Sequence, residues 1–180
     1  MRSNKFFLLV IALLCSESIC AQNYKPVDKA SEVKFTAENL GIDYNGFVGG
    51  LNGRIVFNPT DLNGSTFIVS VDANTFHTGV DLLDNHVKKK KDFLDTDKYP
   101  TISFTSTAIS RKQNVLTVIG LLTIKDVTKT VSFPFTARTQ NNGVLFTANF
   151  RINRKDFHIG GGFTVRENVD ISLRVLAEQL

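Results

Sequence analysis

The 180-residue chain has no tryptophan, and its single methionine and both cysteines, Cys15 and Cys20, lie within the first 21 residues. Disulfides therefore play no part in the remaining sequence, and its hydrophobic core must stabilise the fold alone. After residue 14 no apolar run approaches the 18 or more residues that a transmembrane helix needs. There is no Gly-x-Ser-x-Gly elbow, no glycine-rich phosphate loop and no cysteine nucleophile. We therefore expect a binding protein rather than an enzyme.

The N-terminus has the organisation of a secretory signal. Arg2 and Lys5 precede the uninterrupted apolar run Phe6–Leu14, and small residues follow up to Ala21. We predict a signal peptide over residues 1–21 with cleavage after Ala21; cleavage after Cys20 is the alternative. A lipid anchor on a cysteine is disfavoured because the residues before each cysteine are not uniformly small. The predicted location is the periplasm or the exterior of the cell.

The remaining residues, 22–180, form one predicted domain, since no linker, repeat or low-complexity tract divides them. The leader contributes two of the 21 basic and one of the 17 acidic residues, so this domain carries a net charge of +3. Its acids and bases alternate along most of the expected strands. Together with export, this pattern argues against a nucleic-acid partner. The oligomeric state does not follow from the sequence.

Phenylalanine is abundant and follows an alternating pattern. Of 15 phenylalanines, all but Phe6 and Phe7 lie in the domain, many at every second position of short segments. Such alternation is typical of strands with one apolar and one polar face. Short turns favour antiparallel neighbours, and eight such strands close naturally into a barrel. We therefore predict an all-β fold, an eight-stranded antiparallel barrel, with strands over residues 31–40, 47–57, 66–74, 101–109, 113–124, 129–138, 143–153 and 167–177.

Two features qualify this barrel. Glycines within 47–57 indicate a bent or bulged strand, and Pro134 places its strand at a seam or bulge because it lacks an amide hydrogen. An outer-membrane barrel, with its apolar face toward lipid, is the alternative arrangement. The scarcity of aromatic girdle residues and charges such as Glu32 and Arg174 on the strands argue against it.

Residues 77–100 interrupt the strand pattern. Asp81 is expected to cap a short helix through about Lys91, with Leu83 and Val87 facing inward. We interpret this segment as a gate near one mouth of the barrel, formed by Leu83, His86 and Val87. The run Lys88–Lys91 either solvates the C-terminal end of the helix, which favours cations, or attracts an anionic membrane surface or a diphosphate group.

The inward face supplies the candidate ligand wall. A phenylalanine on this face is either core or pocket lining, and alternation does not distinguish the two. By alternation alone, the apolar wall is predicted to comprise Phe35, Phe57, Ile102, Phe104, Phe133, Phe146, Phe150 and Leu173.

Several motifs stand out: Thr78-Gly79 before the helix, Asp84-Asn85-His86 within it, Asp92-Phe-Leu-Asp before Tyr99-Pro-Thr-Ile-Ser-Phe, Gly120-Leu-Leu-Thr, and Arg154-Lys-Asp-Phe. Together they closely resemble the YceI-like family of secreted, lipocalin-like, polyisoprenoid-binding proteins. The resemblance covers about residues 28–177. It implies a lipocalin-like barrel with a helix near one mouth and a long isoprenoid or other amphiphile along an apolar tunnel.

Two positions depart from the family pattern. Leu83 stands where many members have arginine, which puts in doubt a charge-based contact to a ligand headgroup at that position. His158 stands where glycine commonly follows Asp-Phe, which suggests a different turn geometry there.

Two function classes remain open. The first is a periplasmic carrier whose partner is an amphiphilic lipid, a polyprenyl chain or an isoprenoid quinone, with transient contact to a membrane surface. The second is a filled barrel that acts through its surface as a stress or interaction protein. His77, Asp81, Asp84 and His86 can be drawn as a metal site, but Asp84 and His86 are two positions apart and point to different helix faces. No metal and no cofactor other than the lipid is expected.

Overall fold

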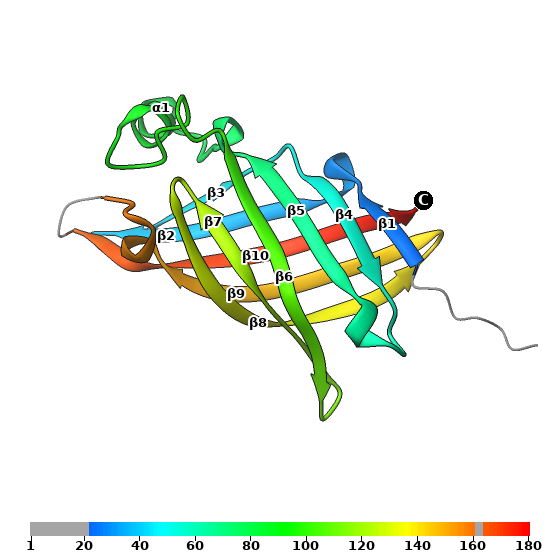
Figure 1. Ribbon diagram of the computed structural model, residues 1–180. Coiled ribbons are helices and arrows are strands. Elements are labelled where there is room, and N and C mark those ends of the chain that lie inside the picture. The colour runs from blue at the N-terminus through cyan, green and yellow to red at the C-terminus, as the bar shows by residue number, and fades with distance from the viewer. Residues whose placement is uncertain (1–21, 161–163) are drawn as a thin grey trace, which may run out of the picture.

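The computed structural model describes residues 22–160 and 164–180. The predicted signal peptide lies outside these residues. One sheet holds ten strands, and short 3₁₀ turns join several of them (Figure 1). The strands are β1 (Gln22–Pro26), β2 (Glu32–Asn39), β3 (Ile42–Phe47), β4 (Asn52–Phe57), β5 (Thr66–Asp72), β6 (Thr101–Lys112), β7 (Val115–Ile124), β8 (Val127–Gln140), β9 (Gly143–Asn153) and β10 (Val165–Gln179).

The ten strands form an eight-stranded antiparallel barrel. β10 pairs with β9 along most of its length, and its other edge pairs with β2 over residues 165–174 and with β1 over 177–179. β1 and β2 therefore occupy one position in the ring, and β3 and β4, which pair with them, occupy the next. The β1–β10 pairing closes the ring, which confirms the predicted fold.

The predicted strand 47–57 is wrong in its boundaries. β3 begins earlier, at Ile42, and the chain leaves the sheet between Phe47 and Asn52 before β4 begins. Gly50 makes this break possible, because its φ of 69° lies in the left-handed region. The sequence pattern also missed β1, which is only five residues long.

Pro134 marks a seam, as its missing amide hydrogen predicts. β8 pairs with β7 over residues 127–135, including Thr117 opposite Pro134. Its pairing with β9, however, covers only residues 135–140. The first half of β8 therefore separates from β9, beyond the position of the proline.

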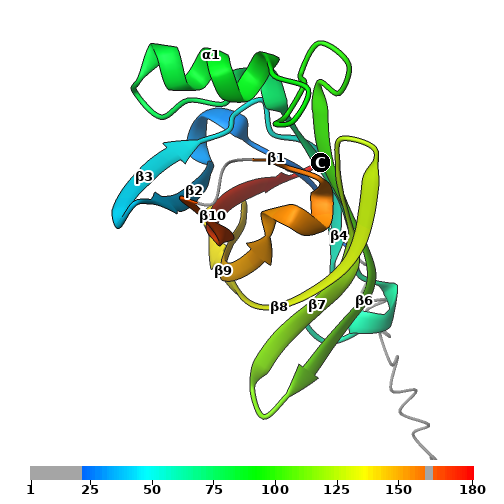
Figure 2. The ribbon, with the colours of Figure 1, turned by 90° about the vertical axis from the view of Figure 1, so that its left-hand side faces the viewer.

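The helix α1 (Asp81–Lys89) lies at the end of the barrel that also holds the tips of β2 and β3 (Figure 2). It ends two residues before the predicted Lys91. The predicted capping role of Asp81 is wrong: Val80 is the N-cap residue, and no side chain caps the helix. Asp84 instead holds the helix to the preceding segment.

The Asp84 carboxylate is buried and accepts three hydrogen bonds. Thr78 donates through its amide at 2.8 Å and its hydroxyl at 2.6 Å, and His77 Nδ1 lies at 2.7 Å. Burial on its own raises the pKa of this carboxyl, but the hydrogen bonds from Thr78 and His77 outweigh it and hold the pKa below its ordinary value.

The apolar faces of the strands point into the interior of the barrel. This is the reverse of an outer-membrane barrel, whose apolar faces point outward to the lipid. One end of the interior is filled by a cluster of four buried rings, Phe57, Phe67, Phe135 and Phe146. Their centroids lie between 5.3 and 6.4 Å apart, mostly edge to face, the arrangement that aromatic quadrupoles prefer. We call this group the phenylalanine plug.

We predict a large loss of stability when a ring at the centre of the phenylalanine plug is removed. Phe146→Ala should lower the free energy of unfolding by about 3–5 kcal/mol, because it removes a buried ring and leaves a cavity. Phe146→Leu, which keeps most of the volume, should cost less. Urea unfolding monitored by circular dichroism measures both. Equal stability of Phe146→Ala and the parent protein would show that the plug is not packed.

We predict that the contribution of Asp84 to the free energy of unfolding depends on pH. Its carboxylate stabilises the fold above its unfolded pKa of about 3.9, and this contribution is lost as the pH falls through the lower folded value. At pH 7, Asp84→Asn should lower the free energy of unfolding by about 1.5–3 kcal/mol through weakened charge-assisted hydrogen bonds.

The difference between Asp84→Asn and the parent should narrow as the pH falls toward 3 in urea titrations. Asp81→Asn, which changes an exposed carboxylate in the same helix, is the matched control. An Asp84→Asn penalty that does not change with pH would contradict this account of the carboxylate.

Candidate ligand pocket

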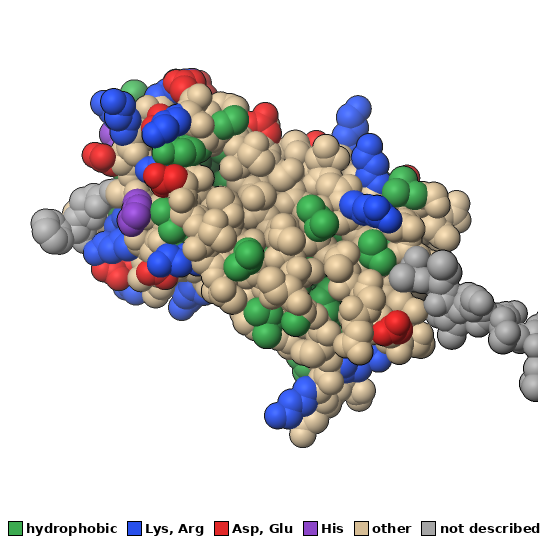
Figure 3. All heavy atoms as spheres, in the orientation of Figure 1, with side chains coloured by type: hydrophobic (Ala, Val, Ile, Leu, Met, Phe, Trp, Pro, Cys, Tyr) green, Lys and Arg blue, Asp and Glu red, His purple; other side chains and the backbone are tan. Residues whose placement is uncertain are grey.

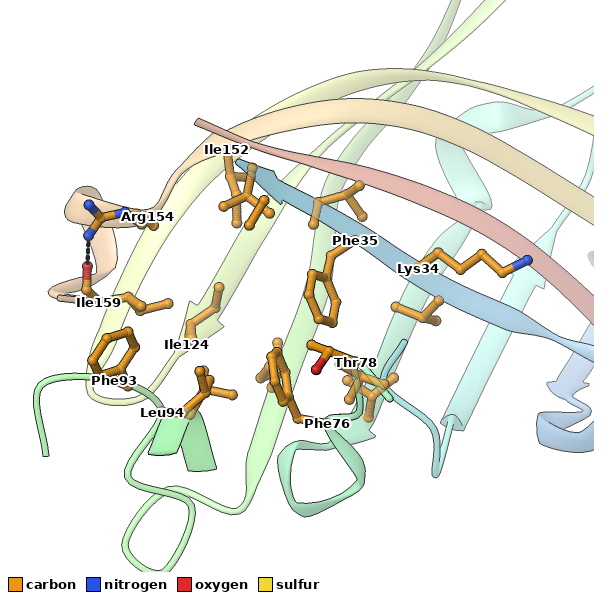
Figure 4. A pocket seen from close by; sticks show the side chains of 18 of the residues that line it. Lys34, Phe35, Phe76, Thr78, Phe93, Leu94, Ile124, Ile152, Arg154 and Ile159 are labelled. Carbon is orange, nitrogen blue, oxygen red and sulfur yellow. Dashed lines mark hydrogen bonds between the residues drawn. The ribbon is translucent and has the colours of Figure 1, made fainter. Parts of the chain in front are cut away.

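The half of the barrel beyond the phenylalanine plug is hollow. It contains a pocket of about 610 Å³, within the range of about 300–1,000 Å³ that small-molecule sites occupy. β2 and β10 supply the largest shares of its wall, β5 to β9 supply the other strand positions, and α1 lies along its open end. The lining is almost entirely aliphatic and aromatic, with few polar side chains (Figure 4).

The structure brings most of the predicted wall residues together. Of the eight, six line the pocket: Phe35, Ile102, Phe104, Phe133, Phe150 and Leu173. The other two, Phe57 and Phe146, do not line it and belong to the phenylalanine plug. Alternation placed all eight on the inner face, but their position along the barrel axis decides whether they meet the pocket or the plug.

Two close approaches to glycine orient the wall. A Cβ at Gly120 would lie 2.4 Å from Phe104 Cζ, and one at Gly46 would lie 2.3 Å from Phe35 Cζ. Each ring therefore lies directly over a neighbouring strand where only glycine leaves room. Two stacked pairs continue the wall: Phe35 on Phe76 at 4.7 Å, and Phe133 on Phe150 at 4.1 Å.

The predicted gate residues Leu83, His86 and Val87 all line the pocket. Val80 and Leu82 line it too, although their exposed fractions are 49% and 83%, so they mark its rim. Phe76, Phe93 and Leu94 complete this side of the pocket and are not among the predicted wall or gate residues. The signal was present, because Phe93 and Leu94 belong to the Asp-Phe-Leu-Asp motif.

Arg154 is the buried cation of the pocket wall, with an exposed fraction of 4%. It donates to four backbone carbonyls: those of Arg166 at 2.9 Å, Ile159 at 2.7 Å, Gly160 at 2.5 Å and Val165 at 2.8 Å. These bonds join η4 (Arg154–Phe157) to the start of β10. They place the guanidinium at the end of the pocket beside Ile159 and Phe93 (Figure 4).

His158, the second departure from the family pattern, is in the left-handed conformation with φ 53° and ψ 29°. Glycine takes this conformation without strain, so the histidine occupies a turn that a glycine would also make. A changed turn geometry is therefore not needed to accommodate it.

The candidate metal residues separate in the structure. His77 and Asp84 contact each other, but the Asp84 carboxylate also accepts a hydrogen bond from Thr78. The ring of His86 packs edge-on against Phe93 with centroids 4.9 Å apart. Within residues 22–160 and 164–180, no group of three or more histidine, cysteine or acidic side chains is placed to hold a metal ion. No helix in the same residues is both long and apolar enough to cross a membrane.

Solved structures with this architecture include BcnA of Burkholderia cenocepacia, with a TM-score of 0.79 and 24% sequence identity over 84% of this chain and 98% of that chain. A polyisoprenoid binding domain of Saccharophagus degradans matches with a TM-score of 0.72 and 13% identity over 87% and 98% of the two chains. At these identities the matches establish the shared fold.

Sequence comparisons find relatives with higher sequence identity than these two solved structures. The UPF0312 protein YE1254 of Yersinia enterocolitica is 30% identical over 154 residues, which is 79% of this chain and 78% of the relative. Protein YceI of Salmonella arizonae is 28% identical over 163 residues, 85% and 84% of the two chains. The YceI-like domain pattern matches residues 24–177, nearly the whole described barrel. The chain therefore belongs to the YceI-like family.

Proposed function

We propose that the protein is a periplasmic binding and carrier protein for an isoprenoid-type lipid, a polyprenyl chain or an isoprenoid quinone. The observation that carries this proposal is the apolar pocket of about 610 Å³ at one end of the barrel. A barrel that acts only through its surface has no need of this hollow. The polyisoprenoid binding domain of Saccharophagus degradans, which has the same fold, supports the same ligand class.

The chemistry of the wall suits an isoprenoid tail. Stacked rings such as Phe35 on Phe76 form flat apolar surfaces against which a methyl-branched chain can pack. Burial of apolar ligand surface contributes about 25 cal/mol per Å², before the costs of association are subtracted. Leu83 lines the pocket and adds apolar surface to its wall. Recognition of the tail then depends on shape and apolar area.

The proposed route into the pocket passes α1. Val80 and Leu82 are exposed at the rim, while Leu83 and Val87 face the pocket from the same element. A small displacement of α1 would widen the opening without disturbing the ladder of the barrel. In this proposal the neighbouring lysines, Lys88–Lys91, attract an anionic membrane surface during loading.

Filling the pocket should weaken lipid binding strongly. Ala37 lines it, so Ala37→Phe should place a ring in the space the lipid needs and reduce uptake of a short-chain quinone or of farnesol by at least about tenfold. Ala108→Phe, the same substitution at an exposed position of β6, is the matched control. Native mass spectrometry of protein purified from its own host, with and without added lipid, measures the bound mass. Undiminished uptake by folded Ala37→Phe would exclude this pocket as the site.

The proposed gating role of α1 leads to a prediction about the exchange of its amide hydrogens. Amides of α1 should exchange faster than those of β9 and β10, because the short helix lies outside the strand ladder, while β9 and β10 pair with each other over residues 143–153 and 168–178. Bound lipid should slow exchange in α1 by contacting Leu83 and Val87. Exchange in α1 that is unchanged by a lipid shown to be bound would argue against a gating role.

A further inference from the structure

The turn between β2 and β3 has a leucine where its backbone disfavours one. Asn39 pairs with Ile42, so the loop has two residues, Leu40 and Gly41, with φ of 53° and 79°. A hairpin turn with positive φ at both positions favours asparagine, aspartate or glycine at the first of them. Leucine is strained there, because its Cβ approaches the following carbonyl oxygen. Its side chain is 74% exposed, so packing inside the protein does not compensate for this strain.

The other tight hairpin turns provide a comparison within the described residues. Two-residue loops also join β6 to β7, β7 to β8 and β8 to β9. Their first residues are Gln113, Lys125 and Asn141, with φ of 46°, 57° and 49°. All three are polar. Among these four turns of the described chain, only the β2–β3 turn therefore presents an apolar side chain to solvent at this position.

Leu40 has exposed apolar neighbours at the same end of the barrel. Ile42 follows it in the hairpin and is 59% exposed, and Val80 and Leu82 are exposed on the side of α1. Asn39, Val80 and Leu82 all line the apolar pocket, so the hairpin and α1 border one opening. Figure 2 shows both elements at the end of the barrel that faces the viewer. We call Leu40, Ile42, Val80 and Leu82 the apolar rim.

Exposed apolar residues elsewhere on the barrel lack this connection to the pocket. Ile68 of β5 and Ile119 and Leu121 of β7 are exposed and do not line the pocket. In Figure 3 apolar side chains are also visible at the α1 end, among the charged ones. The apolar rim differs from the other exposed apolar residues because its α1 side continues directly into the pocket wall. A surface of this kind fits the phase from which an apolar ligand comes.

We propose that the apolar rim docks on a lipid bilayer, with Leu40 and Leu82 inserted at the boundary between headgroups and acyl chains. The inference rests on the proposed function, because a lipid cargo enters from a bilayer and the rim borders the opening that it passes. Shallow burial of apolar side chains gives reversible interfacial binding. The exposed acids Asp43 and Asp81 adjoin the rim in sequence, which limits the insertion to this boundary. Neutral lipid is sufficient, since the contact is apolar.

The first test measures partition onto phosphatidylcholine vesicles by flotation. Leu40→Asn gives the β2–β3 turn the residue that begins the β8–β9 turn, and it should weaken partition at least about fivefold by removing apolar surface. The same change should maintain or raise the midpoint of urea unfolding, because asparagine tolerates positive φ. It should leave farnesol binding in vesicle-free solution unchanged, since Leu40 does not line the pocket. A purely structural role of Leu40 predicts lower stability instead.

Three further variants locate the docking surface. Leu82→Asn should weaken partition as Leu40→Asn does, because it changes the rim on the second element. Leu121→Asn removes an exposed leucine from the outer face of β7 and should bind vesicles like the parent protein. Asn141→Leu places a leucine at the first position of the β8–β9 turn, at the opposite end of the barrel (Figure 1), and should not strengthen binding. Loss of partition in Leu121→Asn equal to that in Leu40→Asn would contradict docking through the rim.

A fluorescent reporter gives the orientation on the bilayer. The chain has no tryptophan, so an introduced one is the sole source of its emission. On vesicles, Ile42→Trp should show a blue-shifted emission that brominated phosphatidylcholine quenches. Val115→Trp, at an exposed position beside the β6–β7 turn, is the control and should show neither change. Quenching of the Val115 reporter alone would place the opposite end on the bilayer and overturn the inference.

The remaining outcomes separate the possible partners. Association that requires anionic lipid, weakens with salt and survives Leu40→Asn would assign docking to the lysines and overturn the inference. Self-association of the parent protein in sedimentation velocity, lost in Leu40→Asn, would show that a second copy covers the rim and would also overturn it. Farnesol binding without vesicle association would overturn the inference and leave the carrier function standing. Vesicle association without farnesol binding would overturn the carrier function alone.

Discussion

The hydrogen-bond ladder of β10 is the interaction on which the rest of the structure depends. This strand pairs with β9 on one edge and with β2 and then β1 on the other, so it joins both ends of the described chain into one ring. Because the ring is closed there, the protein needs neither a disulfide nor a second layer to satisfy its strand edges. The alternating residues of every strand then have an enclosed interior to face.

That interior is divided along its axis. Four edge-to-face rings fill one end, and in the other the rings stand against the wall with space between them. The plug supplies the tightly packed core that a domain of this size needs. It thereby allows the opposite end to remain hollow. Core and pocket are built from the same residue type, and Gly46 and Gly120 leave room for two of the pocket rings to approach the neighbouring strands closely.

Several hydrogen-bonded polar and charged side chains lie at the open end of the barrel. Asp84 holds α1 in place by accepting bonds from Thr78 and His77, while Arg154 and Lys125 tie neighbouring turns together through backbone carbonyls. Each of these groups has a structural task. Two of them, Arg154 and Lys125, are cations whose side-chain hydrogen bonds within the described residues go to backbone carbonyls alone.

The sequence by itself determined the fold class, most of the strands, the inward face and the family, because strand periodicity and contiguous motifs are local properties. It also predicted the seam at Pro134, since a missing amide hydrogen acts wherever the strand lies. It missed β1 and misplaced the break before β4, which depend on pairing with β10 and on the left-handed Gly50. Only the tertiary structure decided that Phe57 and Phe146 fill the plug while Phe104 and Phe150 line the pocket. Only it brought the β2–β3 turn and α1 to one opening. Both outcomes depend on depth along the barrel axis and on long-range register, which a period of two residues does not encode.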